Sequence, residues 1–133
     1  MKAKSLGFYG EKLAAKFLTD NGYEILHNNF SVSGGEIDLV VRKNKIIIFV
    51  EVKTRTSDLF GRGEESFNKT KLARMNKAIK RYLSEGKYPE NIDYRIDLIE
   101  IELEKNNFSL KNLSHFEDIE IGWKHINQPG SRG

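Results

Sequence analysis

Three charged side chains interrupt two apolar segments of this chain, and their types and spacing suit the binding of a divalent metal. Asp38 lies within residues 35–39 (GEIDL), and Glu51 and Lys53 lie within residues 49–53 (FVEVK). Both segments predict core strands, where burying an unpaired charge costs on the order of several kcal/mol. Mg²⁺ would compensate this cost, because it prefers carboxylate oxygens and leaves coordination positions for water and phosphate.

The spacing of Glu51 and Lys53 predicts that both side chains lie next to such a metal. Side chains alternate between the two faces of a strand, so these two project to the same side. The metal would lower the pKa of a bound water and neutralise developing charge. Lys53 could position the nucleophile or stabilise a pentacovalent phosphorus. The alternative is a pair of solvated strand-end charges, because Glu-x-Lys is a frequent tripeptide.

A predicted hairpin brings Asp38 to the same place. The connection at residues 43–45 is too short for a parallel crossover, so residues 36–42 and 46–54 are expected to pair antiparallel. Pairing that is symmetric about the centre of this turn sets Asp38 one residue away from Glu51. A small register shift then brings the two carboxylates together.

The remaining elements follow from hydrophobic periodicity and turn residues. Apolar residues at helical spacing predict two helices, and apolar or alternating runs predict the strands. Residues 108–126 fit either a short strand or an irregular or helical piece. This order implies an α/β fold with a mixed sheet flanked by helices. The predicted elements are helix 5–20, strands 23–30, 36–42 and 46–54, helix 68–85 and strand 94–103.

The composition restricts the class of protein. The 133 residues fit a single domain at residues 1–127, followed by a polar tail at 128–133 that is expected to fray. The absence of cysteine excludes disulfides, zinc-thiolate sites and thiol catalysis, and it agrees with a reducing cytoplasm. No apolar run approaches the roughly 20 residues of a membrane span, and the N-terminus has no apolar signal region. We therefore expect a cytoplasmic protein with no membrane partner.

The second predicted helix carries a one-sided charge. Residues 66–84 contain six basic residues and no acidic one, which favours contact with nucleic-acid phosphates. The alternative is an ordinary solvated helix face. Two further arginines are candidates. One lies two residues after Lys53, and the other lies between two glycines in the loop that follows. The candidate nucleic-acid contacts are Arg55, Arg62, Lys71, Arg74 and Lys77.

A set of residues in one fixed order resembles a known family. The set comprises Gly7, Gly10, Glu11, Ala14, Leu18, Gly22, Tyr23, residues 35–39, residues 49–55, Lys71, Tyr82, Leu83 and residues 95–97. It is similar to the YraN-type family of small bacterial proteins. That family is grouped with the PD-(D/E)xK endonuclease superfamily and most resembles archaeal Holliday-junction resolvases. The resemblance covers roughly residues 5–103, although residues 27–31 lack the arginines that many relatives carry there.

The resemblance implies a fold and a site. The fold is a mixed four- to five-stranded sheet with a helix on either side, which is restriction-endonuclease-like. The site implied is a Mg²⁺- or Mn²⁺-dependent one that cleaves phosphodiester bonds. Asp38 and Glu51 would be its metal ligands, with the Val52 carbonyl as a third, and Lys53 would be its catalytic lysine. Glu11 matches the glutamate that resolvase-like members add; from the residues alone it could point inward or lie on the helix surface.

Two other acidic residues, Glu36 and Asp97, each have two possible roles. Glu36 shares the strand face of Asp38 and could be an additional ligand or a turn residue. Asp97 interrupts the strand at 94–103, and pairing with Arg95 or Lys53 in a structural role is favoured over support of the site.

The leading hypothesis is a metal-dependent endonuclease acting on structured or branched DNA, with a homodimer expected by analogy with resolvases. The alternative is a nucleic-acid-binding accessory module with weak or no cleavage. A third is a structural partner protein with a vestigial site.

Overall fold

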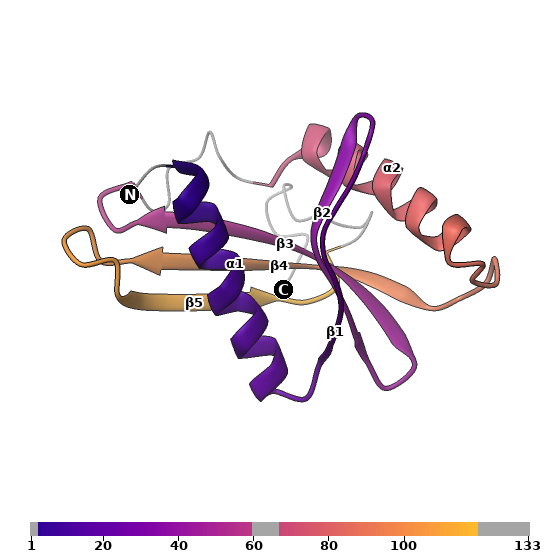
Figure 1. The fold of residues 1–133 in the computed structure, drawn as a ribbon, viewed down its shortest axis with the longest axis horizontal. Helices are drawn as coiled ribbons and strands as arrows, with labels where there is room; N and C mark the ends of the chain where they lie inside the picture. The colour runs from indigo at the N-terminus through magenta and orange to yellow at the C-terminus, as the bar shows by residue number, and fades with distance from the viewer. Residues whose placement is uncertain (1–2, 60–66, 120–133) are drawn as a thin grey trace, which may run out of the picture.

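The computed structural model describes residues 3–59 and 67–119, which form one five-stranded sheet with a helix on each face (Figure 1). The strand order is β1-β2-β3-β4-β5, with β3 and β4 parallel and the other neighbours antiparallel. This confirms the mixed α/β sheet and is consistent with a restriction-endonuclease-like fold. The elements are α1 (Ala3–Asp20), β1 (Glu24–Val32), β2 (Gly35–Lys43), β3 (Ile46–Thr56), α2 (Lys69–Glu85), β4 (Tyr94–Leu103) and β5 (Leu110–Phe116).

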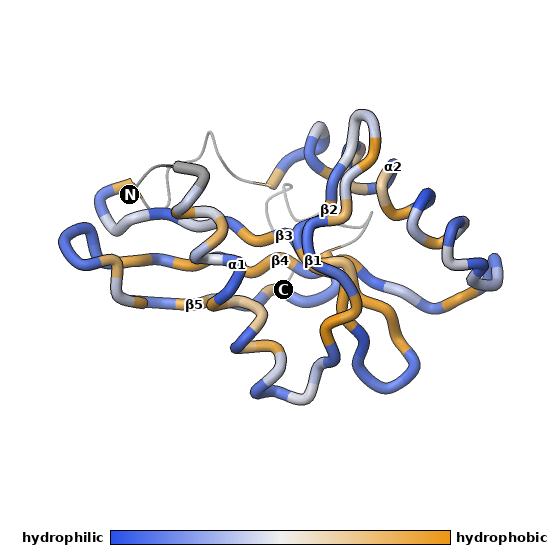
Figure 2. The backbone as a smooth tube through the Cα atoms, in the orientation of Figure 1, coloured by the Kyte–Doolittle hydropathy of each residue, from blue (hydrophilic) through white to orange (hydrophobic). Residues whose placement is uncertain are grey.

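Two hydrophobic cores lie on opposite faces of the sheet. Figure 2 shows hydrophobic residues along much of the central strands. Residues of β3 alternate between the cores, as a strand with both faces covered requires. Ile47 and Phe49 pack beneath α2, whereas Ile48 and Val50 pack beneath α1. The prediction that this segment forms a core strand is therefore confirmed.

The helix ends have identifiable causes. Gly22 follows α1 with a φ of 90°, which glycine adopts without steric cost. Asn68 caps α2, because its side chain accepts a hydrogen bond of 3.0 Å from the Lys71 backbone N–H. After Gly86, the left-handed position belongs to Lys87, with a φ of 57°. Both helices lie where the hydrophobic periodicity predicted them.

The β2–β3 hairpin has a two-residue turn, Asn44-Lys45, because Lys43 pairs with Ile46. Asn44 adopts a φ of 58°, a conformation that asparagine tolerates better than most residues. The resulting register pairs Leu39 with Val50. Continued by one residue, it sets Asp38 opposite Glu51, which is the shift expected from the sequence.

The segment after β4 resolves one alternative left open by the sequence. Its described part forms the strand β5, and beyond it the Ile119 N–H donates to the Ile96 carbonyl at 2.7 Å. Residues 120–126 and the tail at 128–133 lie outside the described residues, as does Arg62. No helix in the described ranges is long and apolar enough to span a membrane. The single domain and the cytoplasmic location stay predictions.

Candidate metal and nucleic-acid site

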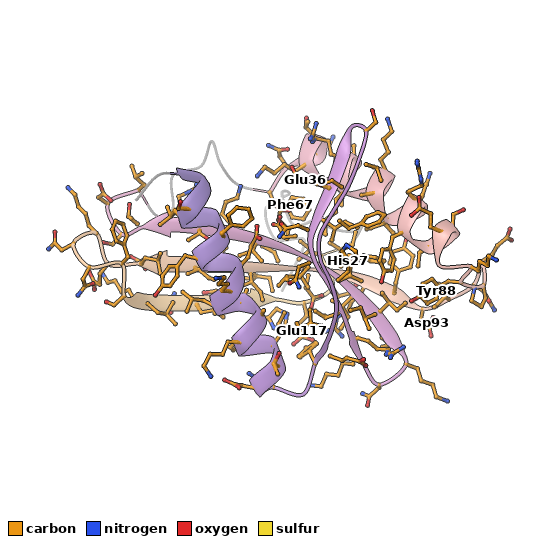
Figure 3. All side chains as sticks on the ribbon, viewed as in Figure 1. His27, Glu36, Phe67, Tyr88, Asp93 and Glu117 are labelled. Atoms are coloured by element: carbon orange, nitrogen blue, oxygen red, sulfur yellow. The ribbon has the colours of Figure 1, made fainter. Side chains whose placement is uncertain are left out.

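A cleft of about 240 Å³ opens where β2 separates from β3, beneath the first turns of α2. The structure brings together there the predicted carboxylates and lysine with two of the basic residues of α2. In Figure 3, Glu36 lies on β2 close to the start of α2. The lining residues are Glu36, Asp38, Glu51, Val52, Lys53, Lys71 and Arg74.

Asp38 lies where the backbone pairing of β2 and β3 stops. The paired residues run from Lys43 and Ile46 to Leu39 and Val50, and no further. Beyond this point the Val52 N–H donates to Asp38 Oδ2 at 2.8 Å, so a carboxylate takes the place of a backbone acceptor.

The same hydrogen bond orients the Val52 carbonyl. The N–H and C=O of one strand residue point to the same side of the strand, so this carbonyl also faces the opening between β2 and β3. Val52 is thereby placed as the resemblance implied, next to Asp38. Glu51 and Lys53, on the opposite strand face from the Val52 side chain, both line the cleft.

The surroundings of Asp38 strongly perturb its carboxyl group. Burial raises the pKa of Asp38, and the charge of Glu51 raises it further, to about 8. The Val52 N–H opposes this shift, whereas Glu11 and Glu36 add to it. A divalent cation in the cleft would reverse the shift, because an opposite charge favours the carboxylate form.

Lys53 has the opposite perturbation. Burial, together with the hydrogen bond and the charge of Lys71, lowers the pKa of Lys53 to about 8. Glu51 partly opposes this shift. Lys71 Nζ lies 3.5 Å from Glu51 Oε2, so a lysine of α2 partly neutralises that carboxylate. At the rim, Arg74 Nη2 lies 3.9 Å from Glu36 Oε1.

Glu11 enters the site from α1. The helix approaches β3 closely at Gly10, where an added Cβ would collide with Thr54 Oγ1. Glu11 Oε1 is buried without a hydrogen-bond partner in the described part of the chain. Burial raises the pKa of Glu11, and hydrogen bonds with Asn29 and Asp38 lower it. Of the two orientations left open by the sequence, the inward one is correct.

The residues present fit a magnesium ion, although they do not form a finished cage. Across the described residues, no group of three or more His, Asp or Glu is arranged to hold a metal. Mg²⁺ usually takes one or two carboxylates and retains several waters. Asp38 and Glu51 supply that number, with the Val52 carbonyl and the unpartnered Glu11 oxygen beside them.

The other predicted nucleic-acid residues are more dispersed. Arg55 follows at the end of β3 and contributes to the lowered pKa of Lys53. Lys77 lies outside the cleft lining, against the tip of the β1–β2 hairpin, where its Nζ would be 3.1 Å from a Cβ placed on Gly34. Of the predicted nucleic-acid residues that the structure describes, Lys71 and Arg74 are therefore the two that line the cleft together with the carboxylates.

Asp97 has a structural role on the other side of the sheet. Burial alone would raise its pKa, but hydrogen bonds from His115, Arg95 and the Asp118 N–H lower it below its usual value. The His115 Nε2 and Arg95 Nε distances to this carboxylate are 2.8 and 2.9 Å. Pairing with Arg95 is confirmed. The contribution of His115 was not predicted, because no local pattern relates residues 18 positions apart.

Comparison with known proteins finds relatives whose names give no activity. A sequence model of the "Uncharacterised protein family UPF0102" matches residues 10–101. A UPF0102 protein of Clostridium perfringens strain SM101 is 51% identical over 98 residues, which cover 74% of this chain and 80% of the relative. A UPF0102 protein of Caldicellulosiruptor bescii is 41% identical over 114 residues, covering 85% and 96%. One from Carboxydothermus hydrogenoformans is 35% identical over 119 residues, covering 90% and 98%.

Proposed function

The chain belongs to the uncharacterised protein family UPF0102, and we propose that it is a metal-dependent endonuclease that hydrolyses phosphodiester bonds of structured or branched DNA. The observation that carries the proposal is the convergence of Asp38, Glu51 and Lys53 in one cleft rimmed by basic residues of α2. Family membership confirms the YraN-type resemblance. Placement in the PD-(D/E)xK superfamily and similarity to archaeal resolvases are part of the proposal, and the five-stranded mixed sheet is consistent with them.

Asp38 and Glu51 would hold the metal, Mg²⁺ or Mn²⁺, with the Val52 carbonyl as a further ligand. When bound, the metal would supply an activated water and neutralise charge on the phosphate. Asp38 is fixed for this task by its hydrogen bond from the Val52 N–H. Glu51 also lines the cleft and is largely buried, with 14% of its side chain exposed.

Lys53 would act on the reacting phosphate. Its ammonium lies on the same strand face as Glu51 and could donate to a non-bridging oxygen or orient the attacking water. The lowered pKa of Lys53 makes a neutral amine accessible near pH 8, so this lysine could also accept a proton. Both roles need Lys53 within the cleft.

Lys71 and Arg74 would hold the flanking backbone. Both line the cleft, and Lys77 lies one turn further along α2. At a rise of about 1.5 Å per residue, these three side chains span about 9 Å of the helix. They would set the position of a strand without reading its sequence, because phosphate contacts carry no base information.

A cleavage assay tests the proposal directly. The substrates are nicked, flapped and four-way-junction DNA, each incubated with Mg²⁺ or Mn²⁺ and the wild type, Asp38→Asn or Glu51→Gln. We expect cleavage by the wild type and loss of at least about a hundredfold in each variant, because each removes a metal ligand. Cleavage that survives both substitutions would show that this cleft is not its source.

A second candidate function is a nucleic-acid-binding accessory module with little cleavage. It is favoured by the contact of Lys71 with Glu51, because an ammonium already compensates this carboxylate without a metal. Binding of the same DNA that persists in EDTA, with no cleavage of any substrate in either metal, would support it.

The endonuclease proposal also includes a homodimer, because a four-way junction presents two strands to be cleaved.

A further inference from the structure

In β1 and β2, side chains stop alternating regularly between the two faces of the sheet. The irregularity occurs at the same level in both strands, where Asp38 lies. In β2, Ile37 and Val40 both pack in the core beneath α2, although residues three apart face opposite sides of a regular strand. In β1, His27 and Phe30 are also three apart, and both contact the same tyrosine ring of α2. The irregularity is therefore shared by the two strands.

Asn29 is the cause of the irregularity in β1. Its φ is 55°, a left-handed conformation that non-glycine residues adopt rarely and asparagine most readily. The pairs Asn28–Leu39 and Phe30–Ile37 place Asn29 opposite Asp38. Backbone strain of this kind costs about 1 kcal/mol or more and persists where the surroundings stabilise it.

The Asn29 side chain interacts with Glu11. The Asn29 side chain hydrogen-bonds to the Glu11 carboxyl, which is the largest effect opposing the burial of that acid. Glu11 in turn contacts Asp38, and its Oε1 stays without a partner among the described residues. A row of three residues thus runs from β1 through α1 to β2: Asn29, Glu11 and Asp38.

We propose that Asn29 is a positioning residue of the site: its left-handed backbone turns the carboxamide toward Glu11 and holds that carboxylate against Asp38. This inference rests on the proposed function for its cation: Asp38 and Glu51 would hold the ion, and the Glu11 carboxylate would lie beside them. Asn29 itself contacts neither the metal nor the substrate. Its effect on the cation is exerted through Glu11.

Substitution of Asn29 by glycine distinguishes this positioning role from a role in folding. Asn29→Gly removes the carboxamide but accepts a φ of 55° without strain, so the fold and the melting temperature should be retained. Asn28→Gly is the matched control. It makes the same substitution one residue earlier in β1, at an exposed residue that pairs with Leu39.

The first measurement needs no metal. In ¹H–¹⁵N spectra of the metal-free protein, we expect the Asn29 side-chain NH₂ signals to lie away from those of a solvated asparagine. Glu11→Ala should move them to the solvated position, and Lys12→Ala, at an exposed neighbour, should not. Asn29 signals that are unchanged by Glu11→Ala would overturn the proposal.

The second measurement is the affinity for Mn²⁺ by titration calorimetry. We expect Asn29→Gly to weaken binding about tenfold, as loss of a residue that orients a ligand typically does, and Asn28→Gly to leave it unchanged. In a Glu11→Gln background, Asn29→Gly should have little further effect. Equal losses in the Asn29 and Asn28 variants would contradict a specific role. If the wild type binds no Mn²⁺, the endonuclease proposal fails, and the NH₂ signals still decide whether Asn29 holds Glu11.

Discussion

The Asp38 carboxyl lies among three other acidic side chains, Glu11, Glu36 and Glu51. Burial raises its pKa most, and the charges of these neighbours add to the shift. In the metal-free protein a proton relieves this repulsion, whereas a divalent cation would relieve it and keep the carboxylate charged. The ionised Asp38 carboxylate is therefore costly at alkaline pH in the metal-free protein, and a bound cation would offset that cost.

The free energy of unfolding of the metal-free protein should depend on the protonation of Asp38. The pKa of Asp38 rises from 3.8 to about 8 on folding, so its contribution to stability is complete below pH 3.8 and is lost as the pH rises toward 8. Asp38→Asn stays neutral and can still accept from the Val52 N–H. We compare urea unfolding in EDTA at pH 5 and at pH 9. Between these two pH values we expect the variant to gain on the order of 4 kcal/mol relative to the wild type, because about three pH units separate pH 5 from the folded-state pKa of Asp38.

The exposed Asp93 provides the control for this measurement. Asp93→Asn removes the same charge from the surface and should leave the pH dependence of the unfolding free energy as in the wild type. A difference between Asp38→Asn and wild type that does not vary with pH would refute the buried-acid explanation.

Asp97 provides a prediction about folding and not about the site. Its carboxylate is fully buried and accepts from Arg95, His115 and the Asp118 N–H. Asp97→Ala leaves a half-buried arginine without this partner, so we expect a loss of about 3 to 5 kcal/mol in urea unfolding. Glu117→Ala removes an exposed partner of the same arginine, 3.2 Å from its Nη2, and should cost less than about 1 kcal/mol. Similar costs for the two variants would contradict this account.

At the scale of the elements, the sequence predicted what depends on local patterns. The helix and strand periods, the Asn44-Lys45 connection and the strand alternation of Glu51 and Lys53 are all local, and the structure agrees with them. The left-handed conformation of Asn29 was not predictable in this way. The preceding residue is also an asparagine, and only the pairing with β2 distinguishes the two.

Contacts between elements were likewise beyond the sequence. The inward orientation of Glu11 depends on how closely α1 approaches β3, and that distance is set by Gly10 against Thr54. The pairing of Lys71 with Glu51 depends on how α2 lies over the cleft. Neither distance appears in the spacing of residues along the chain.

Two glycines of α1 test the close approach of this helix to the sheet. Nothing lies within 4 Å of a Cβ placed on Gly7, whereas one placed on Gly10 would be 2.8 Å from the Thr54 Cβ. Gly7→Ala should stabilise the protein by about 0.5 to 1 kcal/mol through helix propensity. Gly10→Ala should destabilise it by about 1 to 3 kcal/mol, because the helix must move away from β3.

The measurement for this pair is urea unfolding, accompanied by Mn²⁺ titration. Displacement of α1 also displaces Glu11, so Gly10→Ala should weaken Mn²⁺ binding while Gly7→Ala leaves it unchanged. If Gly10→Ala stabilises the protein as Gly7→Ala does, the helix does not lie against Thr54 as described.

For the whole molecule, the distribution of charge matters more than its sum. The net charge is only +3, which would not by itself favour a polyanion. The carboxylates of the cleft are countered on one side by the basic residues of α2. A nucleic acid would therefore meet positive charge along this helix before its phosphate reached the acidic cleft.

This arrangement predicts a localised salt dependence of DNA binding. Each phosphate contact contributes about −0.9 to the slope of log K against log salt, through release of counterions. Replacing Lys71, Arg74 and Lys77 together by alanine should therefore make the slope less negative by about 2 to 3. Fluorescence anisotropy in EDTA, from about 50 to 300 mM salt, measures binding without cleavage. The matched control replaces Lys16, Lys105 and Lys111, which changes the net charge equally but lies on α1, the β4–β5 turn and β5. Equal changes of slope in the two triple variants would mean that DNA responds to net charge and does not bind along α2.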